Sequence, residues 1–400
     1  MNILYVGTLP PHPGGSAMVA YQLLGGLARC GHHVDAIAPA TPKAIAAGDL
    51  FAAAHPEIHV ERFLIPYFES SPDLPAAHQY RRTEGEAIRA AWHRMLARTR
   101  PAVVIVGRET FAWHVPDLAR TVGLPVLLII HGSTWFGLVN NFSKTERERL
   151  LEQMRKADRI VAVASHLAQQ LRSLGFDDVL TIPNAVDLVK FSPRPKNPTL
   201  LTRLGIVDGQ PIVAHLSNLK ALKRPMDIVD AARVVLRQRP DTIWMVVGDG
   251  PCHEVMKQAC VTEPLSGCFR FVGWVEHDLV PDYINLADMV VMPSESEAFA
   301  LIYLETQACG RTLIASDIAA ARHVINDGKN GILFRKGDIS DLSAKIISVA
   351  GNPSLRAAIG KQARQSAMNY DLARWVTAYD TTIRELVDRS AVDRTSQRLR

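Results

Sequence analysis

Two carboxylates, Glu297 and Glu305, lie eight positions apart in the segment 293–316. The first precedes an apolar helix-like run, the second lies inside it, and both follow the buried strand-like run 287–292. Open α/β sheets bind ligands at the carboxyl ends of their strands, so we expect both acids near such an edge. A capped helix with a surface glutamate at each end would give the same spacing, and the neighbouring residues must therefore decide between the two interpretations.

The residues around these acids read Glu297-Ala-Phe-Ala-Leu-Ile-Tyr-Leu-Glu305-Thr-Gln-Ala-Cys-Gly310. This segment resembles the donor-site signature of family 4 retaining glycosyltransferases, E-G-F-G-L-x-x-L-E-A-x-A-C-G. The resemblance implies that Glu305 accepts hydrogen bonds from the ribose of a nucleotide sugar and that Glu297 holds hydroxyls of the donor sugar. Free amides at a helix N-terminus favour a pyrophosphate, and the residues that open this helix are Phe299, Ala300, Leu301 and Ile302.

A basic segment follows the apolar run 212–216. Lysine and arginine there suit the negative end of a nucleoside diphosphate, although an exposed basic turn is the plainer interpretation. The resembling family has a Gly-Arg turn with a lysine five residues after the arginine. Counting back from Lys223, this sequence has Asn218 in place of that arginine, and Lys220 or Arg224 is left to replace it. The pattern Ser-Asn-x-x-x-x-Lys-Arg is similar to the branch that makes N-acetylglucosaminyl malate.

Glycines mark two further turns. Gly14 and Gly15 stand in a loop before a predicted helix, and Gly248 and Gly250 follow the strand-like run 242–247. Without a β-carbon, such residues let a ligand approach the backbone amides. By resemblance, the first pair lies near the donor phosphates and the acceptor entrance, and the second lies next to the nucleotide. A simple surface turn is the alternative for the first pair.

His131 leaves the carboxyl end of the fully apolar run 126–130, where a ligand site is expected. In the resembling family the equivalent His-Gly lies beside the donor sugar, so we expect a substrate contact. Other histidines have no such position, and a structural role is expected for His32, His33, His55 and His78.

The composition is that of an ordinary globular protein, with 48% hydrophobic and 21% charged residues. No apolar run approaches the roughly 18–20 residues that span a bilayer. The N-terminus lacks the features of a signal peptide, which favours a cytoplasmic location. Five cysteines without a C-x-x-C pair argue against zinc. A net charge of +5 suits anionic substrates and is too small to indicate nucleic acid.

Strand-like and helix-like runs alternate along 400 residues, which predicts two α/β domains. We expect the GT-B architecture of the resembling family, with two Rossmann-like, doubly wound domains facing each other across a cleft. The expected domains span 1–190 and 199–369, joined by the proline-rich hinge 191–198. The helix 370–388 would return to the first domain, and the tail 389–400 would be disordered. Strands are expected to begin near residues 3, 34, 59, 103, 126, 160, 179, 212, 242, 269, 289, 312 and 331.

No G-x-G-x-x-G follows any strand-like run, which argues against a dehydrogenase. No D-x-D pair is present either, so we expect a reaction without a metal or other cofactor. Stabilisation of the leaving diphosphate would then come from Lys223 and helix amides. Together with Glu297 and His131, which would orient the sugar, Lys223 forms the predicted catalytic set.

The sequence therefore predicts a retaining transferase that moves a hexose or N-acetylhexosamine from a nucleotide sugar, with UDP preferred, to a small-molecule acceptor. Two alternatives stay open. One is transfer to a lipid-linked or polysaccharide acceptor at the inner membrane, for which the arginine-rich segment 80–100 offers a basic surface. The other is a non-catalytic scaffold that binds nucleotide sugars. Weak peripheral membrane contact and a homodimer are compatible with the sequence, and nucleic acid is not expected as a partner.

Overall fold

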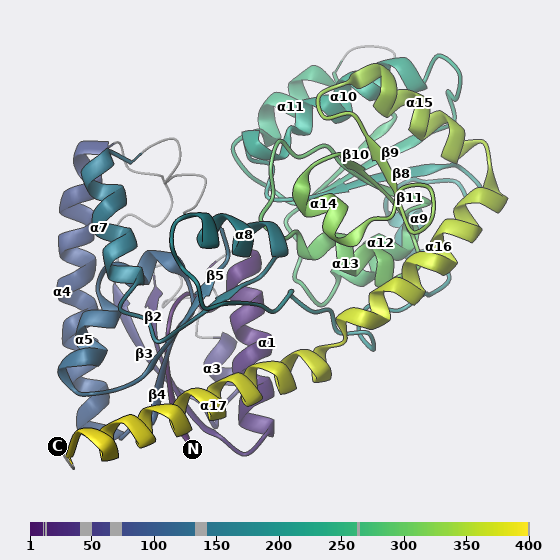
Figure 1. Ribbon diagram of the computed structural model, residues 1–400. Coiled ribbons are helices and arrows are strands. Elements are labelled where there is room, and N and C mark those ends of the chain that lie inside the picture. Colours follow the sequence, from purple (N-terminus) through teal and green to yellow (C-terminus); the bar gives the residue numbers. More distant parts are fainter. Residues whose placement is uncertain are drawn as a thin grey trace. The chain divides into compact units, whose positions relative to one another are not determined.

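A computed structural model of the chain describes residues 1–10, 12, 14–40, 50–64, 74–132, 142–261 and 265–398 (Figure 1). Internal contacts divide the chain into two compact units. Unit 1 comprises Met1–Asn184 together with Ala373–Arg400, and unit 2 comprises Ala185–Leu372. Each unit is built on its own parallel sheet with helices connecting the strands, as the alternation of strand-like and helix-like runs predicts.

Unit 1 contains a seven-stranded parallel sheet in the order β3-β2-β1-β4-β5-β6-β7. Its strands are β1 (Asn2–Val6), β2 (His33–Ala40), β3 (His59–Leu64), β4 (Val103–Val106), β5 (Val126–Ile130), β6 (Arg159–Ala162) and β7 (Val179–Thr181). Its helices are α1 (Gly15–Arg29), α3 (Leu50–Ala54), α4 (Leu74–Arg98), η1 (Glu109–Trp113), α5 (Val115–Thr121), α7 (Lys144–Met154), α8 (Ser165–Ser173) and α17 (Leu372–Arg398).

Unit 2 contains a six-stranded parallel sheet in the order β10-β9-β8-β11-β12-β13. Its strands are β8 (Ile212–Leu216), β9 (Ile243–Val247), β10 (Phe269–Gly273), β11 (Met289–Met292), β12 (Thr312–Ser316) and β13 (Ile332–Phe334). Its helices are α9 (Pro198–Arg203), η2 (Ala221–Lys223), α10 (Pro225–Val235), α11 (His253–Ala259), α12 (Val280–Leu286), α13 (Leu301–Ala308), α14 (Ala319–Val324), α15 (Ile339–Ala350), α16 (Pro353–Ala367) and η3 (Met368–Tyr370).

Each predicted strand is present in the described residues and begins within one residue of its expected start. The central strands are buried along their whole length, as β4, β5 and β11 illustrate. Both faces of a parallel sheet are covered by helices, so these strands are continuous apolar runs rather than alternating ones. This is why short runs such as Val-Leu-Leu-Ile-Ile could be recognised as strands in the sequence.

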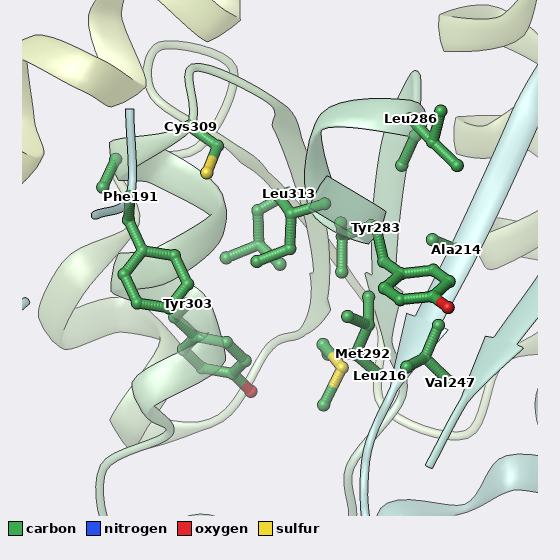
Figure 2. Packing of buried hydrophobic residues seen from close by; sticks show 14 of the residues in the cluster. Phe191, Ala214, Leu216, Val247, Tyr283, Leu286, Met292, Tyr303, Cys309 and Leu313 are labelled. Carbon is green, nitrogen blue, oxygen red and sulfur yellow. The ribbon is translucent and has the colours of Figure 1, made fainter. Parts of the chain in front are cut away.

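The core of unit 2 has two parts because successive side chains of a strand point to opposite faces of the sheet. Along β8, Ile212, Ala214 and Leu216 join one buried cluster, whereas Val213 joins the other. Figure 2 shows the first cluster, in which side chains from the strands meet Tyr283 of α12 and Tyr303 of α13. Helices therefore cover both faces, which is the doubly wound arrangement.

The proline-rich segment 191–198, predicted as the hinge, is anchored in unit 2. Phe191 is fully buried in the cluster of Figure 2, and its carbonyl accepts a hydrogen bond from Arg364 Nη1 at 2.8 Å. The backbone N–H of Arg194 donates to Asn285 Oδ1 at 3.0 Å. The boundary between the units consequently lies earlier than predicted, between Asn184 and Ala185.

Helix α17 belongs to unit 1 from Ala373 onward and lies beside α1 (Figure 1). A β-carbon on Gly26 of α1 would overlap the side chain of Val376, so the glycine lets α17 approach closely. The helix continues to Arg398, through most of the tail predicted to be disordered. The reason is that no glycine or proline occurs between Leu372 and Arg398 to end it. Among the described residues, no helix has the length and apolarity needed to cross a membrane.

Candidate functional site

The strand order of unit 2 reverses between β8 and β11. From β8 the chain moves outward through β9 and β10, and then adds β11, β12 and β13 on the other side. At such a point the two loops leave the carboxyl edge in opposite directions, which opens a crevice that commonly binds ligands. The loops in question are 217–224 after β8 and 293–300 after β11. They carry two of the three residues predicted to be catalytic, Lys223 and Glu297.

Lys223 and Glu297 form an ion pair at this point. Lys223 Nζ donates to Glu297 Oε1 at 2.5 Å, and Ser294 Oγ donates to the same oxygen at 2.7 Å. The side chains are 19% and 9% exposed. Glu297 Oε2 makes no hydrogen bond within the described part of the chain. Since an ammonium has three protons, Lys223 retains donors for a ligand while Glu297 retains an acceptor.

Arg224, one of the two candidates for the missing phosphate-site arginine, is engaged elsewhere. Its Nε and Nη2 donate to the carboxylate of Asp227 at 2.8 and 3.2 Å, and its Nη1 donates to Glu295 Oε2 at 3.0 Å. Because the guanidinium donates these hydrogen bonds to Asp227, the pKa of Arg224 is raised above its ordinary value. The other candidate, Lys220, is exposed and has no ion pair with any described residue. The guanidinium of Arg224 thus links the loop after β8 to the start of α10 and to the loop after β11.

His215 and Ser217 fix the start of the loop that carries Lys223. His215 is buried on β8, with Nδ1 at 2.9 Å from the carbonyl of Val291 and Nε2 at 2.8 Å from Ser217 Oγ. Burial lowers the pKa of His215 to about 4, so its imidazole is neutral at pH 7. Nδ1–H therefore donates to the carbonyl and Nε2 accepts from the hydroxyl. Ser217 Oγ in turn accepts from the backbone N–H of Leu219 at 3.1 Å, and Leu219 has a φ of 39°.

Gly248 and Gly250 lie in the turn after β9, with φ angles of 119° and 156°. A β-carbon on Gly248 would overlap the carbonyl of Ser217, and one on Gly250 would overlap the carbonyl of Asn218. The glycines therefore let this turn pack directly on the loop after β8. The close approach to a nucleotide that the sequence suggested for them stays a prediction. Asn218 itself is exposed.

Helix α13 begins at Leu301, with Ala300 as its N-cap residue and no side chain bonded to its first turn. The first amides of the helix, including that of Ile302, therefore have no partner inside it. Phe299, just before the cap, packs edge-on against His323 at 5.9 Å between ring centroids. Glu305 lies inside α13 and accepts a hydrogen bond at Oε1 from His277 Nε2 at 2.8 Å.

The predicted residues of unit 1 occupy the carboxyl edge of its own sheet. His131 follows β5, and its backbone N–H donates to Oε2 of the buried Glu109 at 3.0 Å. Burial lowers the pKa of His131 to about 4, against the opposing effect of Glu109. Gly14 precedes the first turn of α1 and has a φ of 113°. A β-carbon on Gly14 would meet no described atom within 4 Å, and both Gly14 and Gly15 are exposed.

Glu109 and His277 are among the residues of these sites that were not anticipated from the sequence. Glu109 lies three residues after the end of β4, whereas His131 directly follows β5. Extending the criterion applied to histidines to acids within three residues of a strand end would have found Glu109 as well. His277 lies in the loop after β10 and has no comparable signal, because its partner Glu305 is 28 positions away. Within the described residues, no group of three or more His, Cys, Asp or Glu side chains is arranged to hold a metal ion.

The fold is shared with solved structures of known glycosyltransferases of GT-B architecture. Sucrose-phosphate synthase from Thermosynechococcus elongatus has a TM-score of 0.78 at 19% identity, covering 96% of this chain and 99% of that one. HepE from Anabaena, solved in complex with UDP, has a TM-score of 0.76 at 18% identity, covering 96% and 100%. The two units are therefore the Rossmann-like domains of a GT-B protein.

Two family models match the sequence, Glycosyltransferase Family 4 over residues 13–190 and Glycosyl transferases group 1 over residues 197–366. The chain belongs to the glycosyltransferases that these two models describe, one for each half of the chain. Relatives include 2-deoxystreptamine N-acetyl-D-glucosaminyltransferase of Streptomyces fradiae, 28% identical over 258 residues. Another is N-acetyl-alpha-D-glucosaminyl L-malate synthase of Bacillus anthracis, 27% identical over 229 residues. These matches cover 61% and 56% of this chain and only 61% and 59% of the relatives.

Proposed function

We propose that the protein is a retaining glycosyltransferase that moves a hexose or N-acetylhexosamine from a UDP-sugar to a small-molecule acceptor. The Lys223–Glu297 pair at the switch point of the second sheet carries this proposal. It offers a cation for a diphosphate and a carboxylate for sugar hydroxyls, 2.5 Å apart, on the loops that follow β8 and β11. Two relatives, 2-deoxystreptamine N-acetyl-D-glucosaminyltransferase and N-acetyl-alpha-D-glucosaminyl L-malate synthase, are named for N-acetylglucosaminyl transfer involving small molecules. HepE was solved with UDP.

In the proposed donor complex, each group binds one part of the nucleotide sugar. The free protons of Lys223 and the amides at the start of α13 bind the diphosphate. Lys220, which unlike Arg224 forms no ion pair with the described residues, supplies the second cation. Glu297 binds sugar hydroxyls through its unoccupied oxygen, and Glu305 binds the ribose. From unit 1 we propose His131, whose imidazole is neutral at pH 7, as a contact of the sugar.

The proposed reaction needs no side-chain nucleophile. As the glycosidic bond breaks, its electron pair passes to the β-phosphate oxygen, where Lys223 stabilises the new charge. Preorganised donors of this kind contribute roughly 3–4 kcal/mol each to lowering the barrier. The acceptor hydroxyl attacks from the face that the diphosphate leaves, and its proton passes to a phosphate oxygen. The sugar is thereby transferred with retained configuration, and no metal ion is invoked.

Donor binding is tested by thermal shift with UDP-, GDP-, ADP- and TDP-sugars in EDTA, for the wild type and Lys223→Ala. We expect one UDP-sugar to raise the melting temperature of the wild type and to have much less effect on the variant. A protein that responds to no nucleotide sugar, or only when a divalent metal is added, would contradict the proposed donor site.

Transfer is tested with the donor found in this way and a panel of small acceptors, including L-malate, 2-deoxystreptamine and D-inositol 3-phosphate. We expect donor-dependent formation of UDP and of a product whose anomeric proton coupling in NMR shows the configuration of the donor. Donor binding without turnover on any acceptor would favour the scaffold. Turnover confined to lipid-linked acceptors in vesicles would favour the membrane alternative.

A further inference from the structure

Glu305 is held by an imidazole from another loop. His277, between β10 and α12, has Nε2 at 2.8 Å from Glu305 Oε1 and Nδ1 at 2.9 Å from Lys190 Nζ. The ammonium of Lys190 also donates to Asp278 Oδ1 at 2.6 Å. Four side chains from three separate segments therefore form one chain of polar contacts that ends on a carboxylate of α13.

The partners of His277 determine which of its ring nitrogens carries the hydrogen. An ammonium only donates hydrogen bonds, so Nδ1 must accept from Lys190. The hydrogen of the neutral ring is then on Nε2, where it can only donate to Glu305. Lys190 thereby selects the tautomer that Glu305 needs, a common way of orienting a functional histidine.

Packing restricts the movement of both ends of this contact. The ring centroids of His277 and the fully buried Phe191 are 5.4 Å apart. The side chains of His277 and Glu305 are only 21% and 10% exposed. Glu305 Oε1 is occupied by the imidazole, whereas Oε2 makes no hydrogen bond within the described part of the chain. The carboxylate is thus fixed in one orientation, with one oxygen left to accept hydrogen bonds.

We infer that His277 is a positioning residue for donor binding, which holds Glu305 so that its free oxygen meets a ribose hydroxyl. The inference rests on the proposed function, in which Glu305 binds the ribose of the donor. A carboxylate held in its binding orientation loses less conformational freedom when the ligand arrives, and this increases affinity. His277 contributes through Glu305 alone and does not touch the ligand itself.

The test compares the dissociation constants of ribose and 2′-deoxyribose nucleotides. Isothermal titration with UDP, ADP and GDP and with their 2′-deoxy counterparts identifies the pair that binds and the preference for ribose. The 2′-hydroxyl would donate a hydrogen bond to a charged group. In the wild type we therefore expect the dissociation constant of the 2′-deoxy nucleotide to be about tenfold or more higher than that of the ribose nucleotide. In His277→Ala we expect this preference to fall below about threefold, while the 2′-deoxy nucleotide keeps nearly its wild-type affinity.

Two conservative variants distinguish positioning from a loss of structure. The amide nitrogen of a glutamine can replace Nε2, so His277→Gln should restore most of the ribose preference. Asparagine is too short to reach Glu305, and His277→Asn should behave like His277→Ala. Asp278→Asn is the matched control. It changes the 91% exposed outer partner of Lys190 but leaves the contact between His277 and Glu305 in place, so its preference should match the wild type.

The two failures are distinguishable. If the wild type binds none of the nucleotides, the proposed function and the inference are both overturned. If the wild type binds a nucleotide with a clear ribose preference, and folded His277→Ala retains that preference, only the role of His277 is overturned. An equal weakening of ribose and 2′-deoxyribose nucleotides in all three His277 variants would likewise show that the residue is merely structural.

Discussion

Lys223 donates one ammonium proton to Glu297, and we propose that its other protons bind the leaving diphosphate. Removing the side chain takes away the cation but leaves Glu297 bonded to Ser294. Lys223→Ala should therefore lower kcat by about 10²–10³-fold, in line with the loss of one preorganised donor. Initial rates of UDP release measure this effect.

The control for this variant is Lys257→Ala on α11, whose side chain is 46% exposed and lies outside the proposed site. Its turnover should equal that of the wild type, and urea denaturation should show that both variants remain folded. Wild-type turnover in folded Lys223→Ala would refute the leaving-group role.

Gly248 illustrates a residue whose importance is structural. Its φ of 119° disfavours any other residue, and a β-carbon would overlap the carbonyl of Ser217. Gly209 also has a positive φ, 88°, but open space around it. Gly209→Ala should cost about 1–2 kcal/mol for the backbone conformation alone. Gly248→Ala should cost at least twice as much in urea denaturation, and equal losses would show that the turn adapts to the methyl group.

At the level of elements, strand β8 carries a buried titratable group. The pKa of His215 is lowered by burial to about 4, against about 6.5 in an unfolded chain. Between these values the unfolded state binds the proton and the folded state does not. Folding stability therefore falls as the pH drops from 6.5 towards 4, by about 2 kcal/mol at pH 5 for this group. Below pH 4 the contribution of this group no longer changes.

His215→Asn tests this pH dependence, because its amide can still donate to Val291 but does not titrate. The variant should be less stable than the wild type at pH 7, since the contact with Ser217 is lost. Between pH 7 and pH 5, the variant should lose about 2 kcal/mol less unfolding free energy than the wild type does. The pKa of His131 is also lowered, so this residue should reduce the stability of the wild type and of the variant equally between pH 7 and pH 5. An identical pH dependence of both proteins would mean that His215 is protonated in the folded state.

The elements differed in how far the sequence could predict them. Strands were placed within one residue because burial on both faces makes each of them a continuous apolar run. The residues that we propose for the donor site, such as Glu305, could be suggested from the sequence because they stand in a contiguous motif. Contacts such as those of Arg224 with Glu295 or of Glu305 with His277 join separate loops, and no local pattern encodes them. The segment 191–198 has the composition of a linker, yet the single buried ring of Phe191 anchors it to unit 2.

At the scale of the whole molecule, the two units differ in continuity. Unit 2 is a single stretch, Ala185–Leu372, whereas unit 1 combines Met1–Asn184 with α17 from Ala373 onward, which follows unit 2 in the sequence. The buried apolar side chains of the described part of α17 are those of Trp375, Val376, Tyr379, Ile383 and Leu386. At roughly 1.5–3 kcal/mol per buried side chain, they contribute on the order of 10 kcal/mol before opposing terms. That is comparable to the net stability of a typical domain.

Residues 185–372 expressed alone should therefore fold cooperatively, and residues 1–184 alone should not. Circular dichroism and thermal denaturation of the two fragments measure this difference. Adding a peptide of residues 372–398 to the first fragment should restore a folded state. A cooperative transition in 1–184 without the peptide would show that α17 is dispensable for unit 1.

The dependence of unit 1 on α17 has a consequence for synthesis on the ribosome. Domains generally fold as units in the order in which they emerge, starting from the N-terminus. Of the two units, unit 1 is translated before unit 2, yet its share of α17 up to Leu386 leaves the exit tunnel only when all of unit 2 is available to fold. If unit 1 depends on α17 in this way, the apolar surface that α17 covers stays exposed on unit 1 while unit 2 folds. A chaperone that shields apolar surface would be needed most during that interval.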